Sequence, residues 1–550
     1  MPNHLSGRAT FATVKVGSGC ELRGLLAEAT LFRSRFAFIE GRSPWLLPTA
    51  IAIIALQVRL HGLGDKPFWL DEVASLNRAT STLPELVAGS LHNKHYPTYF
   101  LFLWVVAKLG ASPWLLRFPS AVFGAISAGL ICAIGSDVDS RRTGITAGLL
   151  LALSPFGVQY GQEARSYALV GLLILVALWG LVRLAREPAT AGYRFKRDRM
   201  PPLAWLAYCG GTAAALNILN VAVPWLVAAN LAAIAIAHRA GDARTAFLRN
   251  WGIAHALIIA TWLPSLAAVY IVSDGAVFRG LGWAPPETIA TIWSIVAPVY
   301  LYRITAFITS DLMPAAVPGL SVVIAAMAIY GAWRLRGNPT VLAVIGCGAF
   351  VLPLLLVLVS LVSPVLVPRY FAWSAAPFFL LAGAGLGRFA HWQFAGCITM
   401  LAAAGILNLM PYYRAETKPR WDLVAARLAT TAQQHDVVLL NSWYSQYVLA
   451  AFGARSGLDD RRLLLTWEPA DAARFAPGHG LWVVFGRAGQ GTMATPQDYV
   501  NSLSWLGWPV TEERSGRYIV LWRFETPEAL ATVCGTTSGC PQENRSDAKP

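Results

Sequence analysis

Charged residues are scarce in this chain. Of its 550 residues only 13% are charged, while 55% are hydrophobic, and the mean hydropathy is +0.49. A typical soluble domain devotes about a quarter of its residues to charged side chains, so this composition excludes a soluble globular protein. It predicts a polytopic membrane protein instead.

Among the charged residues, acidic residues are fewer than basic ones. The 30 Asp and Glu residues face 44 Lys and Arg residues, which gives a formal net charge of +14. From residue 412 onward the chain holds 14 basic and 14 acidic residues, so the whole excess lies among the apolar segments and loops before that point. Basic loops on the cytoplasmic side are typical of membrane proteins. This distribution argues against a nucleic-acid-binding surface, and no nucleic-acid partner is expected.

Residues 1–43 lack the short apolar core and the small-residue cleavage site of a cleavable signal peptide. They hold six basic residues ahead of the first apolar segment, which predicts a cytoplasmic N-terminal segment. Cysteine is also sparse, at seven residues. Cys534 and Cys540 are spaced to close a small disulfide loop, and such a bridge requires an oxidising compartment.

Long apolar segments predict about eleven transmembrane helices within residues 44–411. We expect them at 44–60, 115–135, 143–160, 167–185, 203–219, 221–237, 251–271, 315–333, 341–362, 370–387 and 394–411. With the basic loops inside, the loops 61–114 and 272–314 and all residues after 411 lie on the external side. Segment 98–110 is apolar but too short to cross comfortably, so we expect an interfacial helix there.

Residues 412–530 have a different character. The runs DVVLLN, LLLTW, LWVVFG and YIVLWRF have the length and composition of strands, and they alternate with helix-like pieces such as WDLVAARLATTAQQ and YVNSLSWLGW. This pattern predicts a compact periplasmic α/β domain, followed by a polar tail at 531–550.

The external loop 61–114 carries adjacent carboxylates, Asp71 and Glu72. Neighbours on a helix point about 100° apart, so we expect one acid to do chemistry and the other to orient or cap. A simpler interpretation, equally open from spacing alone, is that Asp71 caps the helix that follows it.

The same loop holds the polar run His92 to His95, followed by Tyr99. Two histidines three residues apart near carboxylates could bind a metal ion. A solvated interfacial loop is the simpler interpretation. A third interpretation is that Lys94 and His95 hold an anionic phosphate group.

Two further polar groups fall on the same predicted face. Glu163, Arg165 and Tyr167 lie at the mouth of a span, where charge is costly to bury without purpose; a surface ion pair with Tyr167 at the interface is the alternative. Arg369 and Tyr370 precede another span, where a snorkelling arginine is the alternative. Placement of all these residues on one face favours a single site.

Several motifs resemble those of a known family. They are WLDE at 69–72, HYPTY at 95–99, LRFPSAVFG ending at 124, LSPFGVQYGQEARSYAL at 153–169 and VPRY at 367–370. Over residues 44–411 the chain resembles bacterial membrane glycosyltransferases of the protein mannosyltransferase and aminoarabinose transferase kind, which are glycosyltransferase family 39-like members of the C-type superfamily. His95-Tyr96-Pro97 stands where that family usually has HPP, and LNILNVAVPW stands where it often has a threonine–histidine pair.

The resemblance implies an α-helical polytopic C-type glycosyltransferase fold. It also implies transfer of a sugar from a polyprenyl-phosphate-linked donor to an envelope acceptor, namely a lipid, a glycan such as lipopolysaccharide, or a protein, at the external face of the bacterial inner membrane. The leaving group is a lipid phosphate, already a stable anion, so the reaction needs cations rather than a strong general acid. We expect Asp71 to be the general base, with Glu72 and Glu163 assisting it.

The expected substrate- and phosphate-binding residues are Lys94, His95, Tyr99, Arg165, Tyr167, Arg369 and Tyr370. No cofactor is expected, and a divalent metal stays open. Two rival functions remain: a transporter or flippase of lipid-linked solutes, which would place ionisable residues near the bilayer midplane, and a metal-dependent oligosaccharide ligase using His92, His95 and an acid.

Overall fold

A computed structural model describes residues 44–186, 202–275, 288–302, 316–363, 365–458, 462–476, 479–486, 496–503, 511–516 and 518–524. The N-terminal segment 1–43, the basic loop 187–201, much of the loop 272–314 and the tail with Cys534 and Cys540 lie outside the described residues, so the predictions made for them stay predictions. The chain divides into two compact units, Met1–Leu46 and Leu47–Pro550. The elements below belong to the second unit, apart from the first residue of α2.

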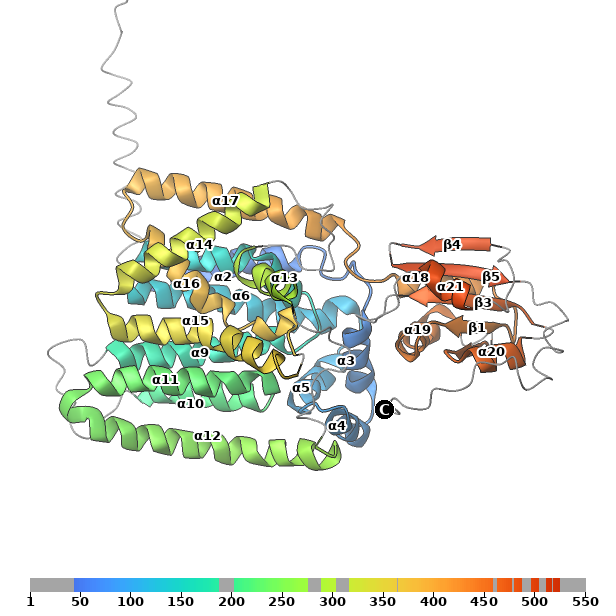
Figure 1. Ribbon diagram of the computed structural model, residues 1–550, viewed down its shortest axis with the longest axis horizontal. Helices are drawn as coiled ribbons and strands as arrows, with labels where there is room; N and C mark the ends of the chain where they lie inside the picture. Colours follow the sequence, from blue (N-terminus) through green and yellow to red (C-terminus); the bar gives the residue numbers. More distant parts are fainter. Residues whose placement is uncertain are drawn as a thin grey trace, which may run out of the picture. The chain divides into compact units, whose positions relative to one another are not determined.

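Apolar helices make up most of the second unit (Figure 1). They are α2 (Leu46–Leu60), α6 (Pro113–Val138), α7 (Arg141–Leu153), α9 (Tyr167–Arg186), α10 (Pro202–Leu216), α11 (Val223–Arg239), α12 (Arg244–Val272), α14 (Ala316–Leu335), α15 (Pro339–Ser360), α16 (Ala375–Leu386) and α17 (His391–Arg414). Each predicted span except 143–160 overlaps a single one of these helices. Among the described residues six helices are long and apolar enough to cross a membrane, and five shorter apolar helices accompany them.

The predicted span 143–160 is in fact two helices, α7 and the short α8 (Pro155–Gly161). Ser154 separates them, and its hydroxyl caps α8 by accepting from the Gly157 amide at 3.2 Å. Pro155 disfavours a helical conformation at the residue before it but suits the first position of a new helix. The break redirects the chain, so that residues 162–166 follow α8 as a short buried connection to α9.

Close contact between α6 and α7 depends on Gly144. A Cβ atom at this position would collide with the carbonyl oxygen of Cys132 and the side chain of Ser136. The two helix backbones therefore approach as closely as small residues allow, which is typical of helix packing in membranes.

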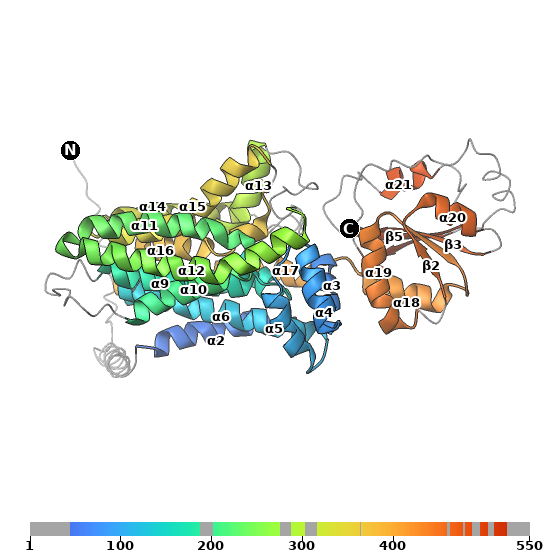
Figure 2. The same ribbon diagram turned by 90° about the horizontal axis from the view of Figure 1, so that it is seen from below.

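The external loop folds into three short helices, α3 (Leu70–Thr80), α4 (Leu83–His92) and α5 (Thr98–Ala107). They gather at one end of the helix bundle (Figures 1 and 2). The ten residues of α5 extend about 15 Å, roughly half the thickness of the hydrocarbon core. This length agrees with the prediction of a short interfacial helix at 98–110. A further helix, α13 (Ile289–Tyr300), and the short 3-10 helices η2 (Asn220–Ala222), η3 (Gly241–Ala243) and η6 (Pro368–Phe371) complete the part of the chain before residue 415 that the structure describes.

Residues beyond α17 contain the predicted α/β fold. The strands are β1 (Val437–Leu440), β2 (Leu464–Thr466), β3 (Leu481–Gly486), β4 (Thr511–Ser515) and β5 (Ile519–Phe524), in the sheet order β2-β1-β3-β5-β4. β1 is parallel to β2 and β3, whereas β5 is antiparallel to both β3 and β4. The helices are α18 (Trp421–Thr431), α19 (Trp443–Ser456), α20 (Pro469–Phe475) and α21 (Pro496–Ser502).

Alternate strand residues face two separate cores. Val438 and Leu440 belong to the cluster that includes α18 and α19 residues, while Val437 and Leu439 belong to the cluster with residues of α20 and α21. Both faces of the sheet are therefore covered, which explains why its central strands are continuous apolar runs. All four predicted strands are confirmed, and the sequence interpretation missed only β4.

Candidate active site

Asp71 lies in the first turn of α3 with its side chain mostly buried. Its Oδ2 lies 3.5 Å from Nη1 of Arg369, the arginine of η6, and accepts no hydrogen bond. Its backbone carbonyl accepts from Nη1 of Arg165 at 3.3 Å. The cap of α3 is not Asp71 but Trp69, whose amide lies 3.5 Å from Oε2 of Glu72. The interpretation of Asp71 as the helix cap is therefore wrong.

Glu72 is fully buried in an ion-pair network. Arg117 of α6 donates two parallel hydrogen bonds to it, from Nε to Oε1 at 2.7 Å and from Nη2 to Oε2 at 2.8 Å. Lys418, from the segment between α17 and α18, donates to Oε2 at 2.6 Å, and the Ala164 amide donates to Oε1 at 3.0 Å. Burial opposes ionisation of Glu72, but Arg117 and Lys418 outweigh it and lower its pKa to about 2.

Two arginines dominate the electrostatics around Asp71. Burial alone would raise the pKa of Asp71, yet the charges of Arg369 and Arg165 lower it below the ordinary value. Asp71 in turn holds the pKa of each arginine above its ordinary value, against the effect of burial. The carboxylate is therefore ionised at neutral pH and serves as a counterion to both guanidinium groups.

Glu163 is a third buried carboxyl group, from the connection between α8 and α9. Its Oε2 makes no hydrogen bond. Burial raises the pKa of Glu163 to about 7, with Lys418 opposing the rise and the charges of Glu72 and Asp71 adding to it. A carboxyl group with this pKa can hold or release a proton near neutral pH.

Aromatic residues and His95 surround the charges. Arg165 lies 5.9 Å from the ring of Tyr167, and Arg369 lies 5.9 Å from the ring of Tyr370. Burial, together with the charges of Arg165 and Arg78, lowers the pKa of His95 to about 3, so this imidazole is neutral and can donate one hydrogen bond and accept another. Tyr99 of α5 is buried beside the same group.

Lys94 is not brought into this cluster. It is exposed, adopts a left-handed backbone conformation with φ of 64° at the end of α4, and makes no ion pair with the other predicted residues. His92 is also exposed. Within the described part of the chain no three His, Cys, Asp or Glu residues are grouped to hold a metal ion. A phosphate-binding role for Lys94 therefore stays a prediction without structural support.

The structure adds three basic residues to the site, and sequence reasoning missed all three. Arg117 lies within the motif LRFPSAVFG, so the motif contained a signal for it. Arg78 of α3 lies over the ring of Phe100 at 4.7 Å, about two helical turns beyond the paired acids. Lys418 follows the last span by only a few residues, and nothing in its local sequence points to a partner 346 positions away.

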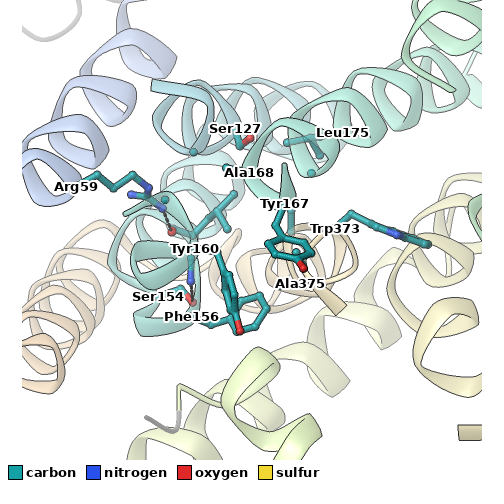
Figure 3. A pocket seen from close by; sticks show the side chains of 17 residues that line it. Arg59, Ser127, Ser154, Phe156, Tyr160, Tyr167, Ala168, Leu175, Trp373 and Ala375 are labelled. Atoms are coloured by element: carbon teal, nitrogen blue, oxygen red, sulfur yellow. Dashed lines mark hydrogen bonds between the residues drawn. The ribbon is translucent and has the colours of Figure 1, made fainter. Parts of the chain in front are cut away.

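An apolar pocket lies among the helices (Figure 3). Its volume is about 50 Å³, and its lining residues include Phe156, Tyr160, Tyr167, Ala168 and Trp373. Arg59 of α2 forms one wall, and its guanidinium donates to the carbonyls of Ala55, Leu151 and Ala152 at 3.0–3.1 Å. Tyr167 lines this pocket and also adjoins Arg165, so the pocket borders the charged cluster.

The sequence and the fold match known proteins as follows. Residues 94–266 match the family model described as dolichyl-phosphate-mannose-protein mannosyltransferase. A comparison with curated proteins finds no match. The fold is similar to the crystal structure of ArnT from Cupriavidus metallidurans in the apo state, at a TM-score of 0.55 and 12% identity, covering 88% of this chain and 98% of ArnT.

Two further structures are similar to this chain. ArnT from Cupriavidus metallidurans bound to undecaprenyl phosphate has a TM-score of 0.50 at 12% identity, covering 90% of this chain and 99% of that one. The oligosaccharyltransferase AglB from Archaeoglobus fulgidus has a TM-score of 0.46 at 10% identity, covering 80% and 69%. The chain therefore resembles the protein mannosyltransferase family over residues 94–266, and its fold is similar to that of ArnT over most of its length.

Proposed function

We propose that this protein is a membrane glycosyltransferase that moves a sugar from a polyprenyl-phosphate-linked donor to an envelope acceptor, with Asp71 as the general base. The observation that carries the proposal is the pairing of a buried, ionised Asp71 with Arg165 and Arg369 beside an apolar pocket. Asp71 Oδ2 accepts no hydrogen bond, so one lone pair is available to take a proton from an acceptor hydroxyl or amine.

Arg165 and Arg369 are proposed to bind the donor phosphate. Arginine matches the geometry of phosphate oxygens, and the solved ArnT complex contains undecaprenyl phosphate. The first isoprene units would enter the pocket lined by Tyr167 and Trp373. Tyr167 and Tyr370 would stack on the sugar or contact the lipid carrier.

The proposed reaction is a direct displacement. The acceptor oxygen or nitrogen attacks the anomeric carbon, its proton passes to Asp71, and the bond between that carbon and the phosphate oxygen breaks. The phosphate leaves as an anion on Arg165 and Arg369, and the configuration at the anomeric carbon inverts. The displacement as written needs no metal ion, and we propose that it takes place at the external face of the bacterial inner membrane.

As the donor binds, its phosphate replaces Asp71 as counterion to the two arginines. The pKa of Asp71 is held down by these arginines, so a bound phosphate anion raises it. A carboxylate with a higher pKa is a stronger base. Donor binding therefore prepares Asp71 for proton transfer.

A deletion strain tests the proposal. We expect mass spectrometry of its envelope lipids, glycans and proteins to show one sugar missing, and this identifies donor sugar and acceptor together. The wild-type gene should restore the modification and the Asp71→Asn variant should not. An unchanged envelope, or full restoration by Asp71→Asn, would contradict the proposal.

A further inference from the structure

A second cavity, which is polar, lies outside the Asp71 cluster, between the segment that follows α2 and the segment that follows α17. Its volume is about 190 Å³. The lining residues are His61, Gly62, Asp65, Lys66, Pro67, Tyr413, Arg414, Ala415, Glu416, Thr417, Lys418 and Arg420. The ring of His61 meets that of Tyr413 at 4.8 Å, and Tyr413 donates to the carbonyl of Val58, so the two helix ends are fixed to each other.

Positive charge predominates in the lining. Four Lys and Arg side chains face two carboxylates, those of Asp65 and Glu416. Two of the four cations are already ion-paired: Lys418 with Glu72 at 2.6 Å and Arg420 with Asp422 at 2.7 Å. Lys66 and Arg414 are the two that remain.

Lys66 is a largely buried ammonium group without a carboxylate partner among the described residues. It donates to the carbonyl of Tyr412 at 2.6 Å and to Oγ1 of Thr417 at 2.9 Å, and it lies 3.9 Å from the centre of the Tyr412 ring. An ammonium group has three donors, so one donor remains for a ligand. Arg414 is exposed at the end of α17, and no ion pair joins it to another described residue.

The surroundings of Lys66 disfavour its charge. Burial, together with the nearby charges of Lys418 and Arg117, lowers the pKa of Lys66 to about 7, and the carboxylate of Asp65 offsets this only in part. A bound anion would restore the charge by supplying the missing opposite sign. A bound anion would therefore stabilise the charged form of Lys66, and a bound cation would destabilise it.

We infer that this cavity binds the phosphate group of an envelope lipid, with Lys66 and Arg414 as its main ligands. The cavity has room for a phosphate group but not for a whole lipid. It lies where the shorter apolar helix α2 and the span-length helix α17 end, and the ends of apolar helices are expected at the level of lipid headgroups. Clusters of basic side chains at this level are typical phosphate-binding sites.

This phosphate site is separate from the proposed donor site. The two are divided by the buried network around Glu72, because Arg117 donates both to Glu72 and to the carbonyl of Lys66, the latter at 2.7 Å. Lys418 lines the cavity and also donates to Glu72 at 2.6 Å. A phosphate in the cavity would therefore lie next to the Glu72 network, which positions α3, and would not contact the arginines beside Asp71.

Residue-specific acetylation tests the inference. Full-length protein in a neutral detergent is pulsed with acetic anhydride at pH 7.5, with inorganic phosphate or with chloride at equal ionic strength, and modification of Lys66 and Lys108 is quantified by mass spectrometry. We expect phosphate to slow acetylation of Lys66 by roughly tenfold, because protonation and occlusion both remove the nucleophilic amine. Acetylation of Lys108, an exposed lysine of the same external loop, should not change.

Matched variants locate the effect. Arg414→Gln should abolish most of the protection, whereas Arg388→Gln, an equal charge change at another exposed arginine, should preserve it. Arg369→Gln should also preserve it, because that residue belongs to the donor site. Equal acetylation of Lys66 with phosphate and chloride, or loss of protection in Arg369→Gln but not in Arg414→Gln, would overturn the inference.

Reconstitution identifies the source of the phosphate. Vesicles of phosphatidylglycerol are compared with vesicles of a phosphate-free galactolipid, both without inorganic phosphate. Protection of Lys66 by phosphatidylglycerol would assign the site to a phospholipid headgroup. Protection by soluble phosphate alone would assign it to the phosphate of a more polar, phosphorylated substrate. Neither arm requires transferase activity, so a failure of the proposed function would not change the outcome.

Discussion

Asp71 and Glu72 are adjacent in the sequence but occupy opposite electrostatic environments. Glu72 accepts hydrogen bonds from Arg117, Lys418 and two backbone amides, so both of its oxygens are occupied. Asp71 retains an oxygen that accepts no hydrogen bond. One acid is committed to structure, and the other is available for chemistry.

Asp71→Asn should therefore abolish transfer while the protein still folds and binds the donor. Loss of a general base costs about 10²- to 10⁴-fold in rate, and asparagine keeps the shape of the side chain. The measurement is the turnover rate in reconstituted vesicles, together with donor affinity. Normal turnover by Asp71→Asn would remove this residue from the role of base.

Arg369→Gln should weaken donor binding more than it affects the maximal rate. A charge-assisted hydrogen bond is worth about 1.5–3 kcal/mol, which corresponds to a rise in the donor KM of roughly 10- to 100-fold. Arg388→Gln removes an equal charge from an exposed position and serves as the control. An unchanged donor KM in Arg369→Gln would show that the phosphate binds elsewhere.

Glu163 should give the enzyme a pH dependence near neutrality. Its pKa in the folded protein is about 7, above the ordinary value of about 4.3, so folding takes up a proton between these values. Its contribution to stability is full at low pH and is lost as the pH rises through 7. The wild-type protein should therefore lose thermal stability between pH 5 and pH 8. A reaction that requires the protonated acid should also slow over this range.

The variant Glu163→Gln imitates the protonated form at every pH. We expect its unfolding temperature and relative activity to vary less than those of the wild type over the same range. A wild-type profile that persists unchanged in Glu163→Gln would assign the titration to another group.

Sequence reasoning at this scale succeeded where a residue lay within a motif and failed where its environment depended on distant contacts. Short motifs predicted four site residues that the structure brings close together: Asp71, Glu163, Arg165 and Arg369. Lys94 came from a motif too, but its left-handed backbone at the end of α4 leaves it exposed. The spacing of residues along the sequence predicts neither the left-handed backbone of Lys94 nor the ion pair between Lys418 and Glu72.

At the scale of elements, the Glu72 network joins α3, α6 and the segment that leads to α18. Removing one partner of a buried ion pair costs about 3–5 kcal/mol, because the other charge is left uncompensated. Glu72→Gln should lower the unfolding temperature strongly, since it leaves both Arg117 and Lys418 without their carboxylate. Lys418→Met should cost less, because Arg117 still neutralises Glu72, and Lys108→Met is the matched surface control.

A double variant separates the network from independent effects. Glu72→Gln combined with Lys418→Met should be less destabilised than the sum of the two single variants, because the second change removes a charge that the first left unpaired. Simple additivity would show that Lys418 and Glu72 do not act together. Differential scanning fluorimetry in one detergent would measure all four proteins.

Element positions were largely predictable because burial on all sides leaves a strong signal. The eleven apolar segments are helices, and the four apolar runs after residue 436 are strands. β4, with the sequence TEERS, was missed because it is an edge strand with mostly exposed polar side chains, and charged edge strands carry no apolar pattern. The break between α7 and α8 was missed because the apolar run continues through Ser154 and Pro155.

At the scale of the molecule, the ion pairs that the structure describes up to residue 418 fall into two separate groups. Asp137 pairs with Arg183 and Arg186, and Asp139 pairs with Arg334, in the group at the turns that the sequence predicts to be cytoplasmic. The other group contains Asp71, the acids and arginines around it, and Lys418. These ion pairs therefore lie at or near helix ends, whereas a transporter is expected to carry charge near the bilayer midplane.

The contact between Lys418 and Glu72 requires the segment after α17 to share a membrane side with the loop 61–114. We therefore expect a cysteine at Thr511, in β4, or at Lys108 to react with a membrane-impermeant maleimide in intact cells, in a background without native cysteines. A cysteine at Arg388, in the predicted cytoplasmic turn, should react only after permeabilisation. Equal labelling of positions 388 and 511 in intact cells would contradict the topology, and labelling of 108 without 511 would show that the Lys418 contact does not form in the membrane.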